Sequence, residues 1–193
     1  MKSNICYLTG ENPDMAGVLK EVELVAAHNK LSSKEAIQLR LLAEEMIGMQ
    51  RGILGFAKGE FYIENKDKTY QLCLHADINV DTETRERFLN LSANSKNSAY
   101  RGFMGKVRLI ADTLLNDSGA DDFCQHESYG GSIYFGQSAE YDKVWEFSQY
   151  KEEVEQDSKE WDEMEKSIVA NLADDVIIGT RKNYIDIVVV KKF

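Results

Sequence analysis

The feature that most constrains the fold is a long amphipathic segment at residues 32–54, which predicts a helix. Ser32 and Glu35 form a Ser-x-x-Glu capping box at the start of this segment. Apolar residues then recur at helical spacing. These residues are Ile37, Leu41, Leu42, Met46, Met49 and Ile53. The segment therefore predicts a helix with one apolar side.

Two adjacent carboxylates, Glu44 and Glu45, interrupt the apolar run of this helix. Burial of a charge is costly unless a partner compensates it, so a glutamate at the edge of an apolar stripe indicates a functional site. The alternative is a glutamate that reaches solvent or pairs with Arg40 or Arg51. Both interpretations stay open at the level of sequence.

The bulk properties of the chain limit its class. Its 193 residues suit one domain, with an acidic helical insertion expected at about residues 119–173. No apolar run reaches the length that spans a membrane, so we expect a cytoplasmic protein without a membrane partner. The formal net charge of -10 opposes binding to nucleic acid, which needs a basic surface. A protein partner or a small ligand is the expected alternative.

Cysteine and histidine spacing gives no sign of a structural metal site. The residues are Cys6, Cys73, Cys124, His28, His75 and His126. They show neither Cys-x-x-Cys nor His-x-x-x-His spacing, and the number of cysteines is odd. We therefore expect no disulfide framework and no bound metal.

Local patterns predict the order of elements. In chain order they are a strand at 4–9, a helix at 14–27, the helix at 32–54, a hairpin of strands 60–64 and 70–77 with a turn at 65–68, helices at 82–91 and 102–116, a glycine-rich loop at 119–136, acidic helices from 139 onward, and a hairpin of strands 176–178 and 185–190. The last hairpin has its turn at residues 179–183. Helices grouped on one face of a mixed sheet give an α+β chain folded as a two-layer α/β sandwich.

The acidic segment from residue 139 onward carries apolar residues seven positions apart. They are Phe147, Val154, Trp161 and Ile168. Such a stripe predicts helices that pack on their own domain. The alternative is a helix that binds a partner or forms a homodimer.

The chain resembles the histidine-kinase-like ATPases, and among them the compact anti-sigma-factor type. The runs that carry the resemblance are LRLLAEEMIGMQRGIL, GEFYIE, TYQLCLHADINVD, RGFMGKVRLIADTLL and DDVIIGTRKNYIDIVVV. They cover roughly residues 4–118 and 174–191. The resemblance implies a nucleotide-binding fold with ATP or ADP as the ligand.

The family's helix motif is Glu-x-x-x-Asn, in which the glutamate activates a water or hydroxyl and the asparagine orients magnesium. By resemblance, Glu45 matches the catalytic glutamate, with Glu44 as the alternative. Met49 or Gly48 then stands where the asparagine belongs. A methionine thioether does not replace a hard oxygen ligand, so a role for Mg²⁺ is doubtful.

The family's second motif, Asp-x-Gly-x-Gly, places an aspartate against the adenine amino group. Asp77 and Asp81 both lie at the corresponding place, and both of the family's glycines are missing. The alternative for Asp81 is a helix cap. The resemblance also matches Thr180 to the threonine of a Gly-Thr pair that closes the adenine pocket, although turn chemistry explains Gly179 and Thr180 equally well.

A glycine-containing helix start is the family's phosphate-binding loop. Gly102 and Gly105 permit close approach of the backbone, and a helix N-terminus offers free N–H groups to an anion. Positive charge gathers around these glycines, from Lys96, Arg101, Lys106 and Arg108. The residues therefore predict a phosphate site, and a helix start with solvated lysines is the alternative.

Three functional hypotheses follow from the resemblance. The first is a regulatory protein that binds ATP or ADP with weak or no catalysis, and we prefer it. The second is a pseudo-ATPase scaffold that binds a protein partner through its acidic helices. The third is an active protein-serine kinase of the anti-sigma type, in which Glu45 acts as the general base.

Overall fold

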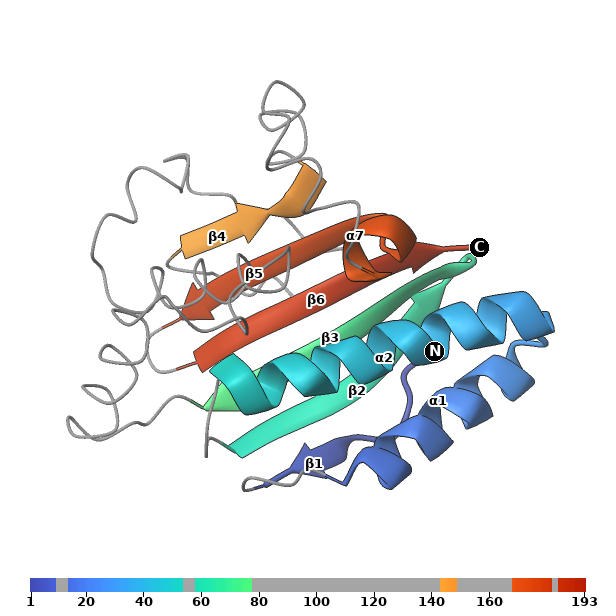
Figure 1. Ribbon diagram of the computed structural model, residues 1–193, viewed down its shortest axis with the longest axis horizontal. Helices are drawn as coiled ribbons and strands as arrows, with labels where there is room; N and C mark the ends of the chain where they lie inside the picture. Colours follow the sequence, from blue (N-terminus) through green and yellow to red (C-terminus); the bar gives the residue numbers. More distant parts are fainter. Residues whose placement is uncertain (10–13, 54–57, 78–142, 149–167, 182–183) are drawn as a thin grey trace.

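One antiparallel sheet and three helices make up the part of the chain that the structure describes. The computed structural model describes residues 1–9, 14–53, 58–77, 143–148, 168–181 and 184–193. Its strands are β1 (Cys6–Leu8), β2 (Lys58–Lys66), β3 (Thr69–Asp77), β4 (Lys143–Glu146), β5 (Asp175–Arg181) and β6 (Tyr184–Lys192). Its helices are α1 (Met15–His28), α2 (Ser33–Ile53) and α7 (Ile168–Leu172) (Figure 1). The predicted α+β class is confirmed.

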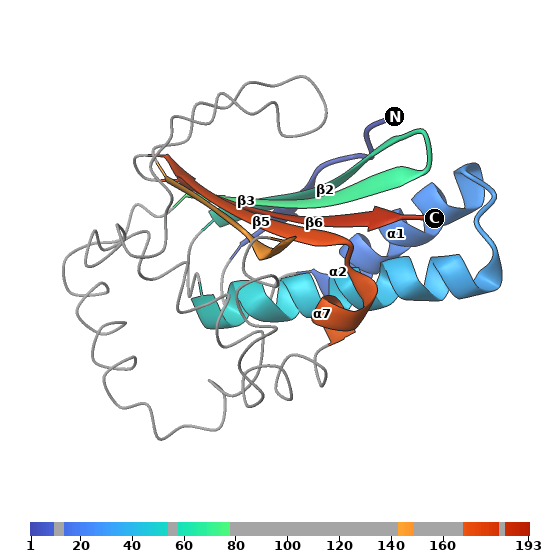
Figure 2. The same cartoon turned by 90° about the horizontal axis from the view of Figure 1, so that it is seen from above.

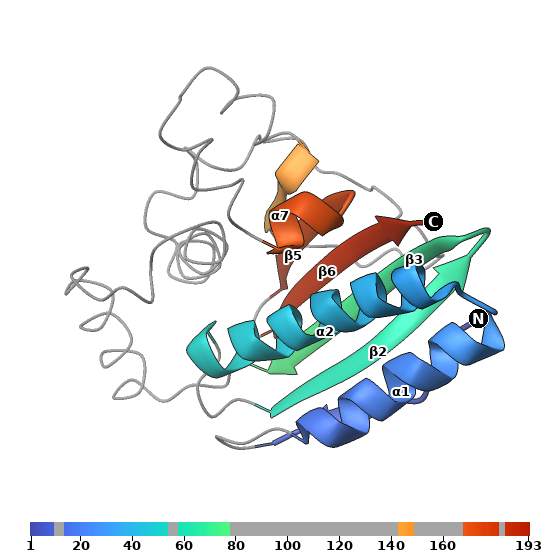
Figure 3. The same ribbon diagram turned by 45° about the vertical axis from the view of Figure 1, so that its right-hand side comes forward.

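The described elements form two layers. The strands follow the order β1-β2-β3-β6-β5-β4 across the sheet. Figure 2 shows α1, α2 and α7 on the same face of this sheet. Helix α2 lies over the middle of the sheet, with α1 on the β1 side and α7 on the β5 side (Figure 3). The prediction of helices grouped on one face is confirmed for these elements.

The prediction of a mixed sheet is wrong for the described strands, because every pair of neighbours is antiparallel. The connection from β1 to β2 shows why this pair is antiparallel. One helix between two adjacent strands reverses the chain direction, so the second strand runs parallel to the first. Two antiparallel helices, α1 and α2, intervene here, so β2 runs opposite to β1.

Local signals at the α1–α2 connection match the sequence pattern. The Ser32 N–H donates to Glu35 Oε2 at 2.7 Å, and the Glu35 N–H donates to Ser32 Oγ at 3.4 Å, so the predicted capping box is confirmed. Lys30 follows α1 with a φ of 54°. The Lys30 N–H donates to the Ala27 carbonyl, and the Leu31 N–H donates to the Ala26 carbonyl. This pair of bonds is a Schellman motif, which ends α1 and turns the chain into α2.

The β2–β3 hairpin is confirmed, with a shorter turn than the sequence predicts. Asp67 and Lys68 alone form the turn, with φ values of 48° and 66°. Two left-handed residues give a type I′ turn, whose twist matches that of the flanking strands. Asn65 and Lys66 therefore belong to β2, where they pair with Tyr70 and Thr69.

The β5–β6 hairpin is also present, but the predicted turn at residues 179–183 is wrong at residues 179–181, which belong to β5, while residues 182–183 lie outside the described residues. Gly179, Thr180 and Arg181 belong to β5 and pair with Asp186, Ile185 and Tyr184 of β6. Gly179 and Thr180 have the composition of a turn, but pairing with the apolar, β-branched residues of β6 stabilises them as a strand. Thr180 lies near the end of a strand.

The segment expected to be helical from residue 139 contains strand β4. Trp145 of β4 is buried in the core, whereas its neighbours Val144 and Glu146 are only partly buried. This period of two is a strand pattern. Phe147 follows β4, is helical and is buried in the same core. Ile168 begins α7 but is 40% exposed, so the predicted stripe of sevens is wrong at this position.

Several predicted elements lie outside the described residues. They are the helices at 82–91 and 102–116, the glycine-rich loop at 119–136, and Val154 and Trp161 of the apolar stripe in the acidic segment.

A single hydrophobic core lies between the helices and the sheet. Strand residues Phe61, Leu72, Leu74, Ile187 and Val189 meet the helices there. Helix α2 buries Leu39, Leu42, Ala43, Met46 and Ile47 in this core. The prediction that Ile37 belongs to the apolar side is wrong, since its side chain is 58% exposed. Ile37 precedes Leu39 by two residues and so lies about 200° around the helix from it.

We predict that shortening a core isoleucine destabilises the fold far more than shortening a surface isoleucine. Ile187→Ala removes a fully buried side chain, and the free energy of unfolding should fall by about 2–5 kcal/mol. Ile37→Ala is the matched control, and its effect should stay within about 0.5 kcal/mol. Urea unfolding followed by circular dichroism measures both. Equal losses would contradict the position of the core.

Candidate functional site

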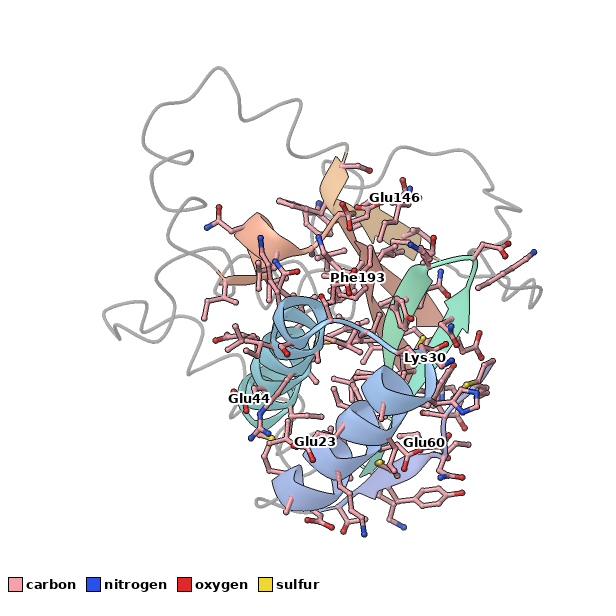
Figure 4. All side chains as sticks on the ribbon, turned by 90° about the vertical axis from the view of Figure 1, so that its right-hand side faces the viewer. Glu23, Lys30, Glu44, Glu60, Glu146 and Phe193 are labelled. Atoms are coloured by element: carbon pink, nitrogen blue, oxygen red, sulfur yellow. The ribbon has the colours of Figure 1, made fainter. Side chains whose placement is uncertain are left out.

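The α2 helix directs Glu44 toward α1. Arg40 Nε donates to Glu44 Oε1 at 3.0 Å, and Arg40 Nη1 donates to Glu23 Oε1 of α1 at 2.7 Å. Figure 4 labels both glutamates on the neighbouring helices. The predicted alternative of a pair with Arg40 is therefore confirmed for Glu44. All three side chains are substantially exposed, so the network is worth little in stability and mainly fixes Glu44 on the α1 flank.

Glu45 lies on the other flank of α2. Successive helical residues differ by about 100° around the axis, and the buried residues Met46 and Ile47 mark the side that faces the sheet. Seen along the helix axis, Glu44 lies between the sheet-facing side and α1. Glu45, about 100° further round, therefore lies on the opposite flank, toward α7. Glu45 is partly buried, and no hydrogen bond or ion pair within the described residues engages it. Of the two candidates, Glu45 is the carboxylate that has no structural partner there.

The ends of β3 and β5 bring two other predicted residues to one end of the sheet. Ala76 pairs with Ile185, and Ile185 pairs with Thr180 on its other side. Asp77 follows Ala76 as the last residue of β3. Because one strand, β6, separates β3 from β5, their backbones lie about 10 Å apart there. The C-terminal end of α2 lies at the same end of the molecule (Figure 1).

Thr180 is one of only two buried polar side chains in the described part of the chain, and it is 5% exposed. Strand alternation places Thr180 on the same face as Val176 and Ile178, which belong to the core beneath the helices. Its hydroxyl therefore lies on the helix-covered face of the sheet.

The other predicted site residues lie outside the described residues. They are Asp81, Lys96, Arg101, Gly102, Gly105 and Lys106. Their roles stay predictions, as do those of Glu45, Asp77 and Thr180.

Sequence reasoning missed an aspartate–histidine pair on the opposite face of the sheet. His75 Nδ1 lies 2.6 Å from Asp186 Oδ1, and the two residues are direct partners across β3 and β6. The Tyr184 ring stacks on the His75 imidazole with 5.0 Å between ring centres. Such a carboxylate holds an imidazole in one orientation. No local signal reveals the pair, because 111 positions separate its members.

Cys73 lies two residues before His75 on the same face, which gives a cysteine, a histidine and an aspartate on adjacent strands. Nucleophilic catalysis would require a thiolate. Burial, followed by the Glu64 carboxylate, raises the pKa of Cys73 to about 12. Burial and the neighbouring Cys73 likewise raise the pKa of Tyr62. The thiol is therefore protonated at neutral pH, and the arrangement does not provide a nucleophile.

The same face carries a small apolar cluster made of Cys73, Ile177, Val188 and Val190. Gln71 lies beside it, 2% exposed, and its Nε2 has no hydrogen-bond partner. A buried amide without a partner costs about 1–3 kcal/mol. None of the described helices lies on this face (Figure 2).

Within the described residues, no group of three or more histidine, cysteine, aspartate or glutamate side chains could hold a metal ion. Cys6 and Cys73 are free thiols. Among the described helices, none combines the length and apolar character needed to cross a membrane.

Comparison of the chain with protein-family models, curated proteins and solved structures gives no match. The functional argument therefore depends on the residues themselves.

We predict that native Cys73 resists alkylation at pH 8. Alkylation needs the thiolate, and a pKa of about 12 leaves almost none of it at that pH. The rate of iodoacetamide labelling at Cys73, measured on its peptide by mass spectrometry, should be at least about a hundredfold below the rate in the urea-unfolded chain. The unfolded chain serves as the control. Rapid labelling of the folded protein would instead indicate an activated nucleophile.

Proposed function

We propose that the protein is a regulatory module that binds an adenine nucleotide, ATP or ADP, with weak or no catalysis. The nucleotide would lie at the end of the sheet where β3 and β5 finish, beneath the C-terminal half of α2. In this assignment Glu45 faces the phosphates, and Asp77 or Asp81 accepts a hydrogen bond from the base. Thr180 closes the pocket, and Lys106 with Arg101 holds the phosphates.

One observation carries this proposal. Glu45, Asp77 and Thr180 were selected from separate parts of the sequence, and the elements that bear them end at the same side of the molecule. Strand register puts the backbones of Thr180 and of Ala76, the residue before Asp77, in line across Ile185 of β6. The pairing of Glu44 with Arg40 adds support, because it leaves Glu45 as the available carboxylate.

The expected weakness of catalysis follows from Met49, which stands four residues after Glu45. Magnesium prefers oxygen ligands in octahedral geometry, and a thioether is a soft donor. Without an oxygen at this position the chain has no ligand of its own there to fix a metal on the phosphates. The presence of Met49 in place of the family's asparagine also favours the second candidate function, a pseudo-ATPase scaffold.

We predict that ATP or ADP raises the melting temperature of the protein, whereas GTP does not. A ligand at about a hundred times its dissociation constant adds about 2.7 kcal/mol of stability. For a chain of this size that corresponds to several degrees. Differential scanning fluorimetry with and without magnesium measures the shift. A shift that magnesium leaves unchanged supports a sensing role, and the absence of any shift would leave the scaffold as the better hypothesis.

Substitutions at the site sharpen this test. Thr180→Val keeps the shape of the side chain but removes its hydroxyl, and it should reduce the nucleotide-dependent shift. The double substitution Arg101→Ala and Lys106→Ala should abolish the shift. Glu45→Gln should remove phosphate release or transfer if the wild type has any, while Glu44→Gln, which changes the same charge on the other flank of α2, is the matched control. Absence of phosphate chemistry in the wild type excludes the kinase hypothesis.

A further inference from the structure

The face of the sheet turned away from the helices, the outer face, is closed to solvent at its centre. Val190 is 1% exposed and Ile177 is 3% exposed. With Cys73 and Val188 they form the outer-face cluster. Tyr184 lies on the same face by strand alternation, yet it is 42% exposed. The burial is therefore local, since it covers the centre of β3, β6 and β5 and ends toward the start of β6.

The described elements do not supply the atoms that cover this cluster. Helices α1, α2 and α7 all lie on the other face of the sheet (Figure 2). Aliphatic side chains on the solvated face of an antiparallel sheet keep part of their surface in water, so the almost complete burial of Val190 and Ile177 requires a further layer above them. This burial arises within a single chain. The covering atoms therefore belong to this chain, outside the described ranges.

A buried amide lies on the same surface. Gln71 pairs with Val190 across β3 and β6, so its side chain lies beside the outer-face cluster. Gln71 is 2% exposed, and its Nε2 has no hydrogen-bond partner among the described residues. An amide donor withdrawn from water is costly unless an acceptor meets it. The surface thus fits an apolar segment that also offers one hydrogen-bond acceptor.

Two segments outside the described ranges are long enough to cover the cluster, 78–142 and 149–167. Segment 149–167 leaves and returns on the helix side, because Phe147 before it and Val169 after it are both buried in the core beneath the helices. It is also strongly acidic, with eight acidic and three basic residues. Carboxylates of the described strands surround the outer-face cluster and would repel it. They are Glu60, Glu64, Glu146, Asp175 and Asp186.

Segment 78–142 meets the requirements of length, position and charge. It makes up about a third of the chain, and its ten acidic and six basic residues are far less one-sided. It begins after Asp77 and ends before Lys143, and strand register places these two residues at the same end of the sheet. A segment of this length with both ends there can cross the outer face and return.

We propose that residues 78–142 pack on the outer face of the sheet, over the outer-face cluster, and supply the acceptor for the Gln71 amide. The sheet is then the middle layer of three, and the β3–β6 pairing is shielded from water on both faces. A protein partner that binds this chain must use another surface. The inference does not depend on nucleotide binding.

Photo-crosslinking in the full-length chain tests this placement. Tyr62 packs against the outer-face cluster from β2, so Tyr62→p-benzoylphenylalanine puts a photoreactive ring at its border. Irradiation of dilute protein should link this ring to a peptide within residues 78–142, identified by mass spectrometry after proteolysis. The cross-link should be lost when the chain is unfolded in urea.

Ile37→p-benzoylphenylalanine is the matched control, because Ile37 is exposed on α2 at the other face of the sheet, and it should not give this cross-link. Circular dichroism checks that each variant folds. If the Tyr62 variant does not fold, the same probe at Val144, which packs on the cluster from β4, repeats the test. A cross-link to residues 149–167, a link only between two molecules, or no link from a folded variant overturns the proposal.

Discussion

The pairing of β3 with β6 is the contact on which the rest of the structure depends. Nine residues of β3 pair with nine of β6, although one such pair, His75 and Asp186, is 111 positions apart in the chain. β2 and β1 extend the sheet from β3, while β5 and β4 extend it from β6. Leu74 and Ile187 form one of these pairs and are both fully or almost fully buried beneath the helices. Closing so long a loop costs entropy, and burial of this apolar surface must offset it.

The elements that the sequence predicts well are those set by neighbours along the chain. The capping box at Ser32 is a contact between residues three positions apart, and it forms as the pattern indicates. The pair between Arg40 and Glu44 is likewise one helical turn in length. Both hairpins follow from runs of β-branched and aromatic residues. Local chemistry therefore determined where most of the described helices and strands lie.

The errors concern features that distant residues decide. Whether strands run parallel or antiparallel depends on the number of reversals between them, which composition does not report. Gly179 and Thr180 have the composition of a turn, yet their register with Ile185 and Asp186 keeps them in β5. The short strand at Val144 and Trp145 lies in acidic surroundings that favoured a helix. His75 and Asp186 become neighbours only through the β3–β6 register.

At the candidate site, the sequence alone did not distinguish Glu44 from Glu45 as the catalytic glutamate. The ion pair between Glu44 and Arg40 distinguishes them. Glu44 is committed to Arg40 and through it to α1, whereas Glu45 lies on the opposite flank of α2 and has no partner among the described residues. The choice between Asp77 and Asp81 has no such discriminating contact. It depends on Asp81, which lies outside the described residues.

A ligand at this end of the sheet would act on the same contact that holds the fold together. It would touch α2 and β3 from the first half of the chain, and β5 from the second. Binding energy realised only in the folded state adds to stability, so such a ligand would reinforce the joining of the two halves through β3 and β6. A regulatory role of this kind needs only ligand binding and no catalysed reaction. Under the proposed function, a nucleotide that bridges α2, β3 and β5 would raise the stability of the β3–β6 junction.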